Sequence, residues 1–500
     1  MAIRNKVVLA MLFFSLLALS AYSYLGTQEP DVDPELITCN HQCQQQQQYS
    51  EEEKRICEER CEEYQRMKKE RQKEIEEEAR RKKEREHHQR QDEGSDEEGG
   101  EEESREKENP FVFQDKHFET RVETDDGRVW VLQKFTKKSE LLRGIENFRL
   151  VILEANGHTF VSPCHFDSEV VFVVVKGRAT IGLVKEEGTE RFNLQPGDIM
   201  RVPAGATVFM VNRDEREKLF IAKFHMPVSI PGEFEAFYGP GGEDPESFLT
   251  AFSWEILQAA YKTQRHKLQR LFEGQKKGSM FNVSREHVEA LSKRTMSPGI
   301  WPFGRQWRGP FNLLSNGPSV SNEYGRLFEM SPDKQTQFQD INLLITWVNI
   351  TNGSMTAPLY NSLATNVALV IDGKGDFEMA CPHISFSSEG RSSSATYQRV
   401  SARLRPGVVF VVPAGHPFVT VASTNTNLQI ICFEVNARGN KRIALAGKKN
   451  VVKAMDDRVK ELAFNFPAKL VQRIFNRDEQ FFFPGPCTFE EREELGRAYA

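Results

Sequence analysis

The chain carries one short pattern twice: residues 194–211 read LQPGDIMRVPAGATVFMV, and residues 404–421 read LRPGVVFVVPAGHPFVTV. Both stretches contain Pro-Gly, five further residues and then Pro-Ala-Gly. The intervening residues are rich in Ile, Val, Met and Phe, which favour strands, whereas Pro and Gly favour turns on either side. The pattern therefore predicts two equivalent units of turn, strand, turn and strand, one in each half of the chain.

The repeat extends beyond these two stretches. Further segments match in the same order along both halves: NPFVF at 109–113 with GPFNL at 309–313, Gly127-Arg128 with Gly325-Arg326, Asn156-Gly157 with Asn352-Gly353, Gly177 with Gly373, and LQRLF at 268–272 with VQRIF at 471–475. Short runs of Val, Ile and Phe alternate with turn residues, which is typical of a β-sandwich or barrel. Apolar residues three and four positions apart then predict helices. We expect a mainly β fold in which a barrel with a helical extension is duplicated.

The chain has 500 residues, too many for a single hydrophobic core. We expect five regions along it: a signal peptide at 1–23, a cysteine-rich and charged extension at 24–108, a first barrel with its helices at 109–278, a second at 279–486, and a tail at 487–500.

The N-terminus is expected to be a secretory signal peptide. Arg4 and Lys6 precede an apolar run from Val7 to Leu19, and Ala21-Tyr22-Ser23 offers a small-residue cleavage site. The apolar run is shorter than the roughly 18 residues that a membrane span needs, and no later stretch reaches that length. A soluble mature protein of the secretory pathway is expected. Sequons for N-glycosylation begin at Asn282, Asn349 and Asn352.

The extension opens with four cysteines, Cys39, Cys43, Cys57 and Cys61. A spacing of four places the two thiols of each pair on one helical face, so two antiparallel helices could be joined by nested disulfides. Three pairings are formally open, and geometry favours Cys39–Cys61 with Cys43–Cys57. A zinc site is the alternative, although an oxidising compartment favours disulfides.

The rest of the extension, up to residue 108, is highly charged and has almost no apolar residues, which predicts a partly helical and then disordered linker. Acidic residues interrupt its basic patches throughout. The formal net charge of the whole chain is -6 and its pI is about 6.1. We therefore expect neither a nucleic-acid nor a membrane partner.

The Pro-Gly and Pro-Ala-Gly stretches are similar to the second conserved motif of the cupin superfamily. Two of them in tandem, together with NPFVF, PAGHPFV at 413–419 and FFFPGP at 481–486, resemble the vicilin-type (7S) seed storage globulins. The cysteine hairpin resembles the N-terminal extension of some vicilin precursors. The resemblance implies jelly-roll barrels, a homotrimer joined through helices near 245–275 and 450–476, and deposition as a nitrogen reserve in storage vacuoles.

Cupin enzymes hold a metal between two histidines in an H-x-H motif, a glutamate and a third histidine, and neither barrel offers that set. In the first barrel, SPCHFDSE at 162–169 retains His165 and Glu169, and Cys164 could replace a ligand in a register that is ambiguous by one residue. Val208 occupies the position of the third histidine. The corresponding residues of the second barrel are Leu359, Asn361 and Phe418. The chain is therefore expected not to be an enzyme.

A separate metal site is expected at Cys381, His383 and His416. Cys381 and His383 are two apart in a strand-like run, so their side chains would point to the same side, and His416 precedes another strand. A thiolate and two imidazoles suit copper, and zinc less well. Some vicilins with the same C-P-H and G-H-P segments bind copper there, with a tyrosine as fourth ligand where this chain has Phe111. Without a metal, Cys381 would be a small buried hydrophobe beside hydrogen-bonded histidines.

The leading hypothesis is a non-enzymatic storage globulin with a copper site. Two alternatives stay open. The cysteine hairpin could have a defence role after release, or the barrel cavities could bind a metal or small ligand.

Overall fold

The computed structural model describes residues 43–44, 50–66 apart from 53, 64 and 65, and 109–486 apart from 186–187, 240–241, 243, 294–308, 333–334, 336–337 and 383–396. The chain divides into two compact units, residues 1–91 and 92–500. Within the described parts, no helix is both long and apolar enough to cross a membrane.

The N-terminal unit contains a helix over residues 54–63 and a disulfide between Cys43 and Cys57, which confirms that half of the predicted pairing. Cys61 is also disulfide-bonded, and Cys39, its predicted partner, lies outside the described residues. The expected signal peptide and charged linker lie outside them as well.

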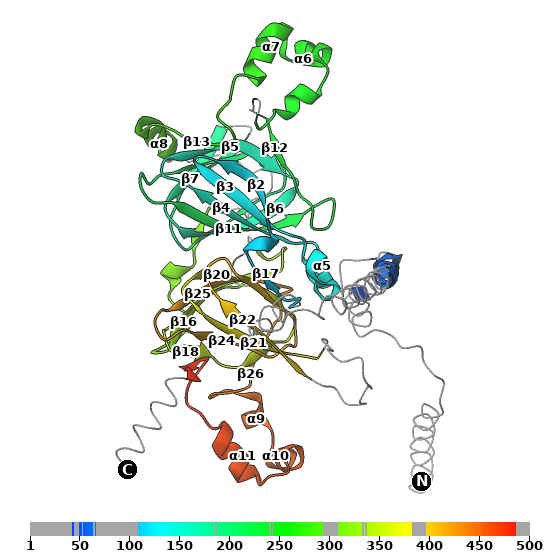
Figure 1. Ribbon diagram of the computed structural model, residues 1–500, viewed down its shortest axis with the longest axis vertical. Helices are drawn as coiled ribbons and strands as arrows, with labels where there is room; N and C mark the ends of the chain where they lie inside the picture. The colour runs from blue at the N-terminus through cyan, green and yellow to red at the C-terminus, as the bar shows by residue number, and fades with distance from the viewer. Residues whose placement is uncertain are drawn as a thin grey trace, which may run out of the picture. The chain divides into compact units, whose positions relative to one another are not determined.

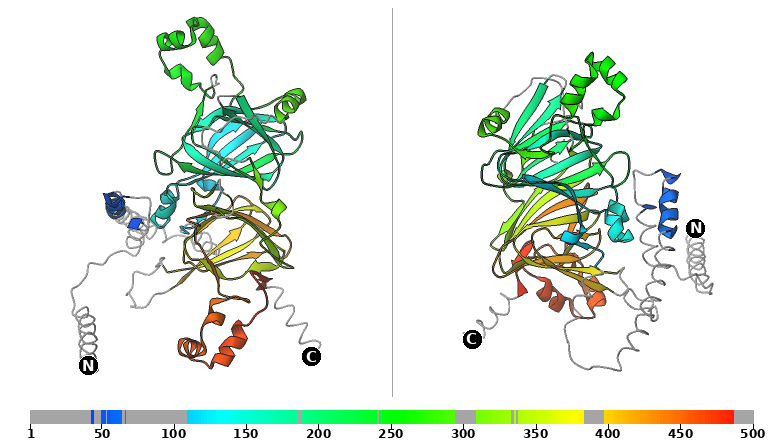
Figure 2. Two further views of the ribbon diagram at one scale, coloured as in Figure 1. Left: turned by 180° about the vertical axis from the view of Figure 1, so that it is seen from behind. Right: turned by 45° about the horizontal axis from the view of Figure 1, so that its top comes forward.

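Two barrels, each of two antiparallel sheets, make up the second unit (Figures 1 and 2). The larger sheet of the first barrel contains, in spatial order, β14 (Phe311–Asn312), β9 (Asp198–Val202), β6 (Ser168–Lys176), β11 (Leu219–Pro227), β4 (Arg149–Ala155), β3 (Gly127–Leu132) and β2 (Phe118–Thr124). The smaller sheet contains β12 (Ala236–Tyr238), β5 (Thr159–Phe166), β10 (Val208–Asn212), β7 (Ala179–Lys185) and β8 (Gly188–Leu194), with β13 (Met280–Asn282) paired to β5.

The second barrel repeats this plan. The counterpart of the larger sheet of the first barrel contains β1 (Val112–Phe113), β23 (Val409–Val412), β20 (Thr365–Asp372), β25 (Leu428–Val435), β17 (Leu343–Ile350), β16 (Gly325–Met330) and β15 (Val320–Asn322). The other contains β22 (Gln398–Leu404), β21 (Gly375–Cys381), β24 (Phe418–Ala422), β18 (Ser354–Thr356) and β27 (Phe482–Pro484), with β19 (Leu359–Asn361) paired to β24 and β26 (Arg442–Ala444) paired to β19. The predicted mainly β fold with two barrels is confirmed.

Each barrel is completed by a strand that precedes the other barrel in the chain. β1, from NPFVF, pairs with β23 of the second barrel and places Val112 opposite Phe410. β14, from GPFNL, pairs with β9 of the first barrel and places Phe311 opposite Ile199. The two matching segments therefore exchange places between the barrels.

The glycines of the repeated Pro-Gly pairs make these turns feasible. Gly197 and Gly407 have φ angles of +86° and +90°, a region that residues with a Cβ rarely adopt. A Cβ at Gly197 would also lie 2.7 Å from Cγ of Leu314, which follows the exchanged strand β14. The pattern that first indicated the repeat thus lies where the other half of the chain docks.

One hydrophobic cluster extends across both barrels because alternate residues of β11 face different sides. Leu219 and Ile221 lie in the cluster inside the first barrel, whereas Ala222 and Phe224 belong to a cluster that includes many side chains of the second. The rings of Phe224 and Phe433 stack with centroids 4.8 Å apart. β11 therefore stabilises both the first barrel and its contact with the second barrel.

A helical extension projects from each barrel (Figure 1). The helical extension predicted after each barrel is confirmed, and each consists of several short helices. The first comprises the 3₁₀ helix η4 (Phe248–Ala251), α6 (Trp254–Tyr261) and α7 (Arg265–Phe272), and the second α9 (Val451–Ala454), α10 (Asp457–Phe464) and α11 (Ala468–Phe475). Lys262 and Asn465 end α6 and α10 in the left-handed conformation, at equivalent positions. The remaining helices are η2 (Asp115–His117), α5 (Phe135–Lys138), η3 (Glu140–Ile145), α8 (Arg285–Ser292) and η5 (Leu314–Asn316).

Truncating the stacked ring between the barrels tests the shared cluster. Phe224→Ala should lower the free energy of unfolding by about 3–5 kcal/mol, because Phe224 is fully buried and the cavity cannot close without moving both barrels. Chemical denaturation measures the loss. Phe237→Ala, at a ring that is 38% exposed, is the matched control and should cost much less. Equal losses for the two variants would contradict the shared cluster.

Candidate functional site

The register of the strands shows which residues of this chain occupy the positions that hold metal ligands in cupin enzymes, here called the enzymatic positions. Val208 on β10 lies opposite Cys164 on β5, and Phe418 on β24 lies opposite Leu359 on β19. Cys164 is therefore the counterpart of Leu359, and the ambiguity of one residue is resolved. His165, the next residue of β5, packs elsewhere, with its ring stacked on Phe237 at a centroid distance of 5.0 Å.

Glu169 has a structural role. Its carboxylate accepts hydrogen bonds from Arg201 Nε at 2.7 Å and from the backbone N–H of Ala204 at 3.2 Å. Arg201 also donates to Asp340 at 2.6 Å. The three metal-ligand candidates of the first barrel are thus not assembled into one site.

The first barrel instead encloses a cavity of about 190 Å³ with a basic side chain in it. Lys223 and His225 follow Ile221 on the inward side of β11 and line this cavity with Cys164 and Tyr238. The Lys223 ammonium lies 5.8 Å from the centre of the Phe166 ring and pairs with no carboxylate in the described part of the chain. A partly buried cation without a counter-ion among the described residues marks this cavity as electropositive.

Burial perturbs the titration of every one of these groups. It lowers the pKa of Lys223, and it lowers the pKa of His225 well below the usual value, with the positive charge of Lys223 adding to the effect. It raises the pKa of the Cys164 thiol to about 11 and that of the Tyr238 hydroxyl to about 12. Nδ1 of His225 shares a hydrogen bond with Ser168 Oγ at 2.9 Å, whereas its Nε2 has no partner among the described residues.

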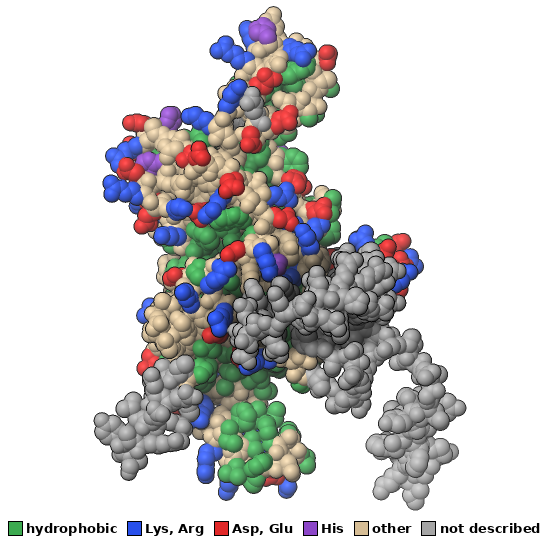
Figure 3. Space-filling model, viewed as in Figure 1, with side chains coloured by type: hydrophobic (Ala, Val, Ile, Leu, Met, Phe, Trp, Pro, Cys, Tyr) green, Lys and Arg blue, Asp and Glu red, His purple; other side chains and the backbone are tan. Residues whose placement is uncertain are grey.

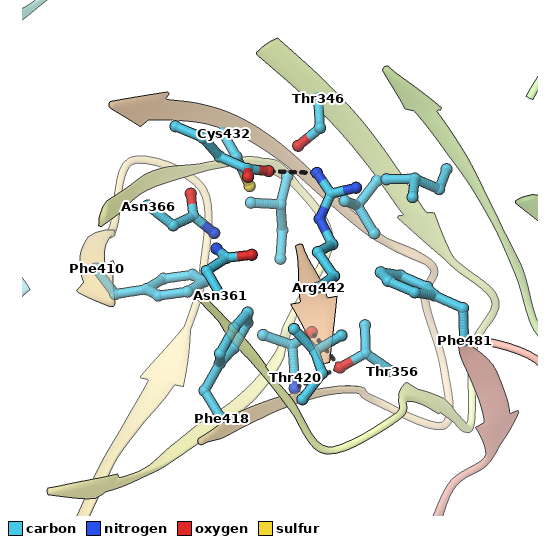
Figure 4. Close-up of a pocket in the computed structure, with 15 residues that line it drawn as sticks. Thr346, Thr356, Asn361, Asn366, Phe410, Phe418, Thr420, Cys432, Arg442 and Phe481 are labelled. Carbon is cyan, nitrogen blue, oxygen red and sulfur yellow. Dashed lines mark hydrogen bonds and ion pairs between the residues drawn. The ribbon is translucent and has the colours of Figure 1, made fainter. Parts of the chain in front are cut away.

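The second barrel has different chemistry at the same positions. Counted along the paired strands from the matching glycines of the repeat, Lys223 corresponds to Cys432 and His225 to Glu434. A smaller cavity, about 40 Å³, lies beside them (Figure 4). Its polar lining consists of Thr346, Thr356, Asn361, Asn366, Thr420, Cys432, Glu434 and Arg442.

An ion-paired arginine crosses this cavity. Arg442 donates from Nη2 to Glu434 Oε1 at 2.5 Å and from Nη1 to Glu329 Oε2 at 2.7 Å. Burial raises the pKa of the Cys432 thiol to about 12, so it stays protonated at neutral pH. The enzymatic positions of this barrel, Leu359, Asn361 and Phe418, line the same cavity.

Two of the three predicted ligands of the separate metal site lie opposite each other. β21 and β24 pair with Met379 opposite Phe418, and the N–H of Ala380 donates to the carbonyl of Pro417 at 2.8 Å. Continuing that register by one residue places Cys381 opposite His416. Both side chains are buried.

The third predicted ligand, His383, lies outside the described residues. Phe111, which stands where the resemblance implies a tyrosine, does lie at this site: its ring centroid is 6.2 Å from that of His416. The exchanged segment that leads into β1 therefore forms part of the wall.

The N-terminal unit contains a second sulfur cluster. Cys43, Cys57 and Cys61 are buried, and their sulfurs lie within 4.8 Å of one another. Such a triad could bind a metal as thiolates, whereas disulfide sulfurs lack the charge that metal binding needs. In the disulfide-bonded form the cluster is a structural staple.

Sequence reasoning missed the groups inside the barrels. Lys223, Arg442 and Glu434 are charged residues in strand-like runs, and FIAKFHM at 220–226 places Lys223 between apolar neighbours. A lysine inside this apolar run was the signal in the sequence that could have indicated a charged group inside the barrel. The direction of the side chain could not be read from it, because residues that flank it in the same run face the other barrel.

The chain is similar in sequence to known proteins. The Cupin family model matches residues 119–229 and 311–472. Vicilin Cor a 11.0101 of Corylus avellana is 59% identical over 394 residues, 78% of this chain and 86% of its own length. The sucrose-binding protein of Glycine max is 51% identical and covers 98% of this chain and 99% of its own.

Solved structures agree. The crystal structure of the Corylus avellana vicilin superposes with a TM-score of 0.71, at 59% identity, over 75% of this chain and all of its own. A vicilin from Solanum melongena superposes with a TM-score of 0.72 at 35% identity, over 76% of this chain and 99% of its own, and is described as holding different anionic ligands in structurally similar pockets.

Proposed function

The chain belongs to the vicilin (7S globulin) family of the cupin superfamily, and we propose that it is deposited as a homotrimer in seed storage vacuoles. The family predicted from the motifs is confirmed, and with it a non-enzymatic seed storage globulin. The expected signal peptide, which lies outside the described residues, would supply the route to the vacuole.

The observation that carries the trimer proposal is the apolar surface of the helical extensions. Eleven of the 18 large apolar side chains that are exposed among the described residues lie on these two segments. They are Phe248, Phe252, Ile256, Tyr261 and Leu271 on the first, and Val459, Leu462, Phe464, Phe466, Leu470 and Ile474 on the second. Figure 3 shows the apolar side chains gathered over α9 to α11.

Such surfaces are costly in water and normally mark a contact with another chain. The two extensions differ in sequence, so the first extension of one chain would bind the second extension of the next. A contact of this head-to-tail kind closes into a ring when the rotation allows it. Three chains per ring is what the vicilin family implies for this protein.

Charges placed on the second extension should break the ring. Leu462→Asp and Ile474→Asp, at side chains that are 85% and 66% exposed, should yield single chains, because burying an unpaired carboxylate in an apolar contact is unfavourable. Light scattering coupled to size-exclusion chromatography measures the mass. Val184→Asp, at an exposed residue of β7, is the control and should leave the mass of three chains. An unchanged mass for both extension variants would exclude this contact.

We also propose that Cys381, His383 and His416 bind a copper ion. Support comes from the buried, directly opposed positions of Cys381 and His416 and from the chemistry of the donor set. A thiolate with imidazoles suits copper better than zinc or harder cations. Phe111 offers no ligand atom, so this chain alone would supply three donors, and the ion would be held without a redox role.

Copper content tests this proposal. Elemental analysis should find copper in the wild-type protein and none in Cys381→Ser or His383→Ala. Cys432→Ser, which alters a buried thiol in the neighbouring cavity, should retain it. Phe111→Tyr adds a hydroxyl beside His416 and should slow copper release to a chelator. Copper that is absent from the wild type, or unchanged in both ligand variants, would rule the site out.

A second role, binding of a small anion in the first barrel, is favoured by the environment of Lys223. Among the described residues its ammonium has no carboxylate partner and Nε2 of His225 has no hydrogen-bond partner, and a cavity of about 190 Å³ is large enough for a small carboxylate. The Solanum melongena vicilin is described as holding anionic ligands. An anion would offset the cost of the buried charge.

Acetate provides the probe for this role. At constant ionic strength, acetate in place of chloride should raise the thermal midpoint of the wild-type protein, by an amount that corresponds to about 2.7 kcal/mol at 100 times the dissociation constant. Lys223→Met should lose the rise, and Lys176→Met, at an exposed lysine of β6, should keep it. A rise of equal size in all three proteins would count against Lys223.

A further inference from the structure

Two buried oxygen atoms in the second barrel belong to residues that line the same cavity, and neither accepts a hydrogen bond within the described part of the chain. Asn366 on β20 and Glu434 on β25 are directly opposed residues of adjacent strands, so their side chains lie on one face of the sheet. They are 5% and 2% exposed. Asn366 Oδ1 and Glu434 Oε2 have no partner among the described residues. Buried acceptors of this kind are rare and indicate that a donor or cation belongs between them.

A neighbouring contact fixes the orientation of the carboxylate. The other carboxylate oxygen of Glu434, Oε1, accepts from Arg442. Rotation of the carboxylate would break this hydrogen bond. Glu434 Oε2 is therefore held in place before any ligand arrives.

The charges around the cavity favour a cation. Arg442 is the single positive group here, and it pairs with two carboxylates, Glu434 and Glu329. The cluster therefore has a net charge of -1. Glu434 is almost fully buried, and a buried charge is unfavourable unless it is compensated. A water molecule could donate to both oxygens but would leave this charge uncompensated.

The volume restricts the ion to a small one. About 40 Å³ accommodates one to three water-sized groups and excludes amino acids and sugars. Divalent calcium favours six to eight oxygens and magnesium near-ideal octahedral geometry with several waters, which one available carboxylate does not provide. The remaining lining oxygens belong to neutral hydroxyl and amide groups such as Thr346 and Asn361, as Figure 4 shows.

We propose that this cavity binds one monovalent cation, ammonium or an alkali-metal ion, between Glu434 Oε2 and Asn366 Oδ1. The site is distinct from the Cys381 site and from the anion cavity of the first barrel. At the corresponding positions the first barrel has His225 and Val170, which provide no carboxylate or amide oxygen. The inference stands independently of copper binding, trimer assembly and the anion role.

Rubidium chloride is the probe that locates the ion. The full-length protein is purified in tetramethylammonium chloride, whose cation is too large for the cavity, and exchanged into rubidium chloride at equal ionic strength. The midpoint temperature of thermal unfolding should rise as rubidium or ammonium chloride is added. Crystals should show an anomalous peak between Glu434 and Asn366.

Two variants separate binding from a general effect of salt. Asn366→Val introduces the residue found at the corresponding position of the first barrel, and Glu434→Gln removes the charge with little change in shape. Each should abolish the rubidium-dependent rise and the anomalous peak, whereas Lys176→Met, at an exposed lysine of the other barrel, should preserve both. If Glu434→Gln does not fold, Asn366→Val alone decides.

Four results would overturn the proposal. They are the absence of an anomalous peak in wild-type crystals, density for water alone at this position, a rise that tetramethylammonium reproduces, and an equal rise in Asn366→Val. Because chloride is the only anion added to every solution, these outcomes do not depend on whether the first barrel binds acetate.

Discussion

The exchange of β1 and β14 is the constraint on which the remaining architecture depends. Neither barrel completes the sheet that contains β9 or β23 from its own half of the chain, because each takes one edge strand from the segment that precedes the other barrel. Stacking of Phe224 on Phe433 then fills the space between them. This arrangement presents the two helical extensions from a single unit, and a ring of identical chains requires contact surfaces held in that way.

Sequence reasoning was reliable where side-chain type and spacing decide the outcome. The repeated Pro-Gly pairs located the barrels because a positive φ at Gly197 admits few other residues, and one disulfide followed from helical spacing. It was weaker where direction along a strand decides. Cys164 and His165 are adjacent, and only the pairing with Val208 shows which of them occupies the enzymatic position. The break at Lys262 has no clear signal in the sequence.

The barrel interiors show that one scaffold can hold different chemistry in its two copies. The enzymatic positions hold Cys164 and Val208 in one barrel and Leu359 and Phe418 in the other, which cannot form the histidine-rich set of a cupin enzyme. Charged side chains lie instead on the inward side of β11 and β25. β11 carries Lys223, which has no carboxylate partner among the described residues, and β25 carries the carboxylate of Glu434, because a shared backbone constrains side-chain direction but not side-chain charge.

The position of Phe111 beside His416 links the proposed metal site to the boundary between the extension and the barrels. Its ring belongs to the segment that precedes the first barrel in the chain and pairs with the second barrel. A protease that trims the chain past residue 113 during germination would withdraw one wall of the site along with an edge strand of the sheet. Release of a bound metal and the onset of reserve breakdown would then be the same event, timed by one cut.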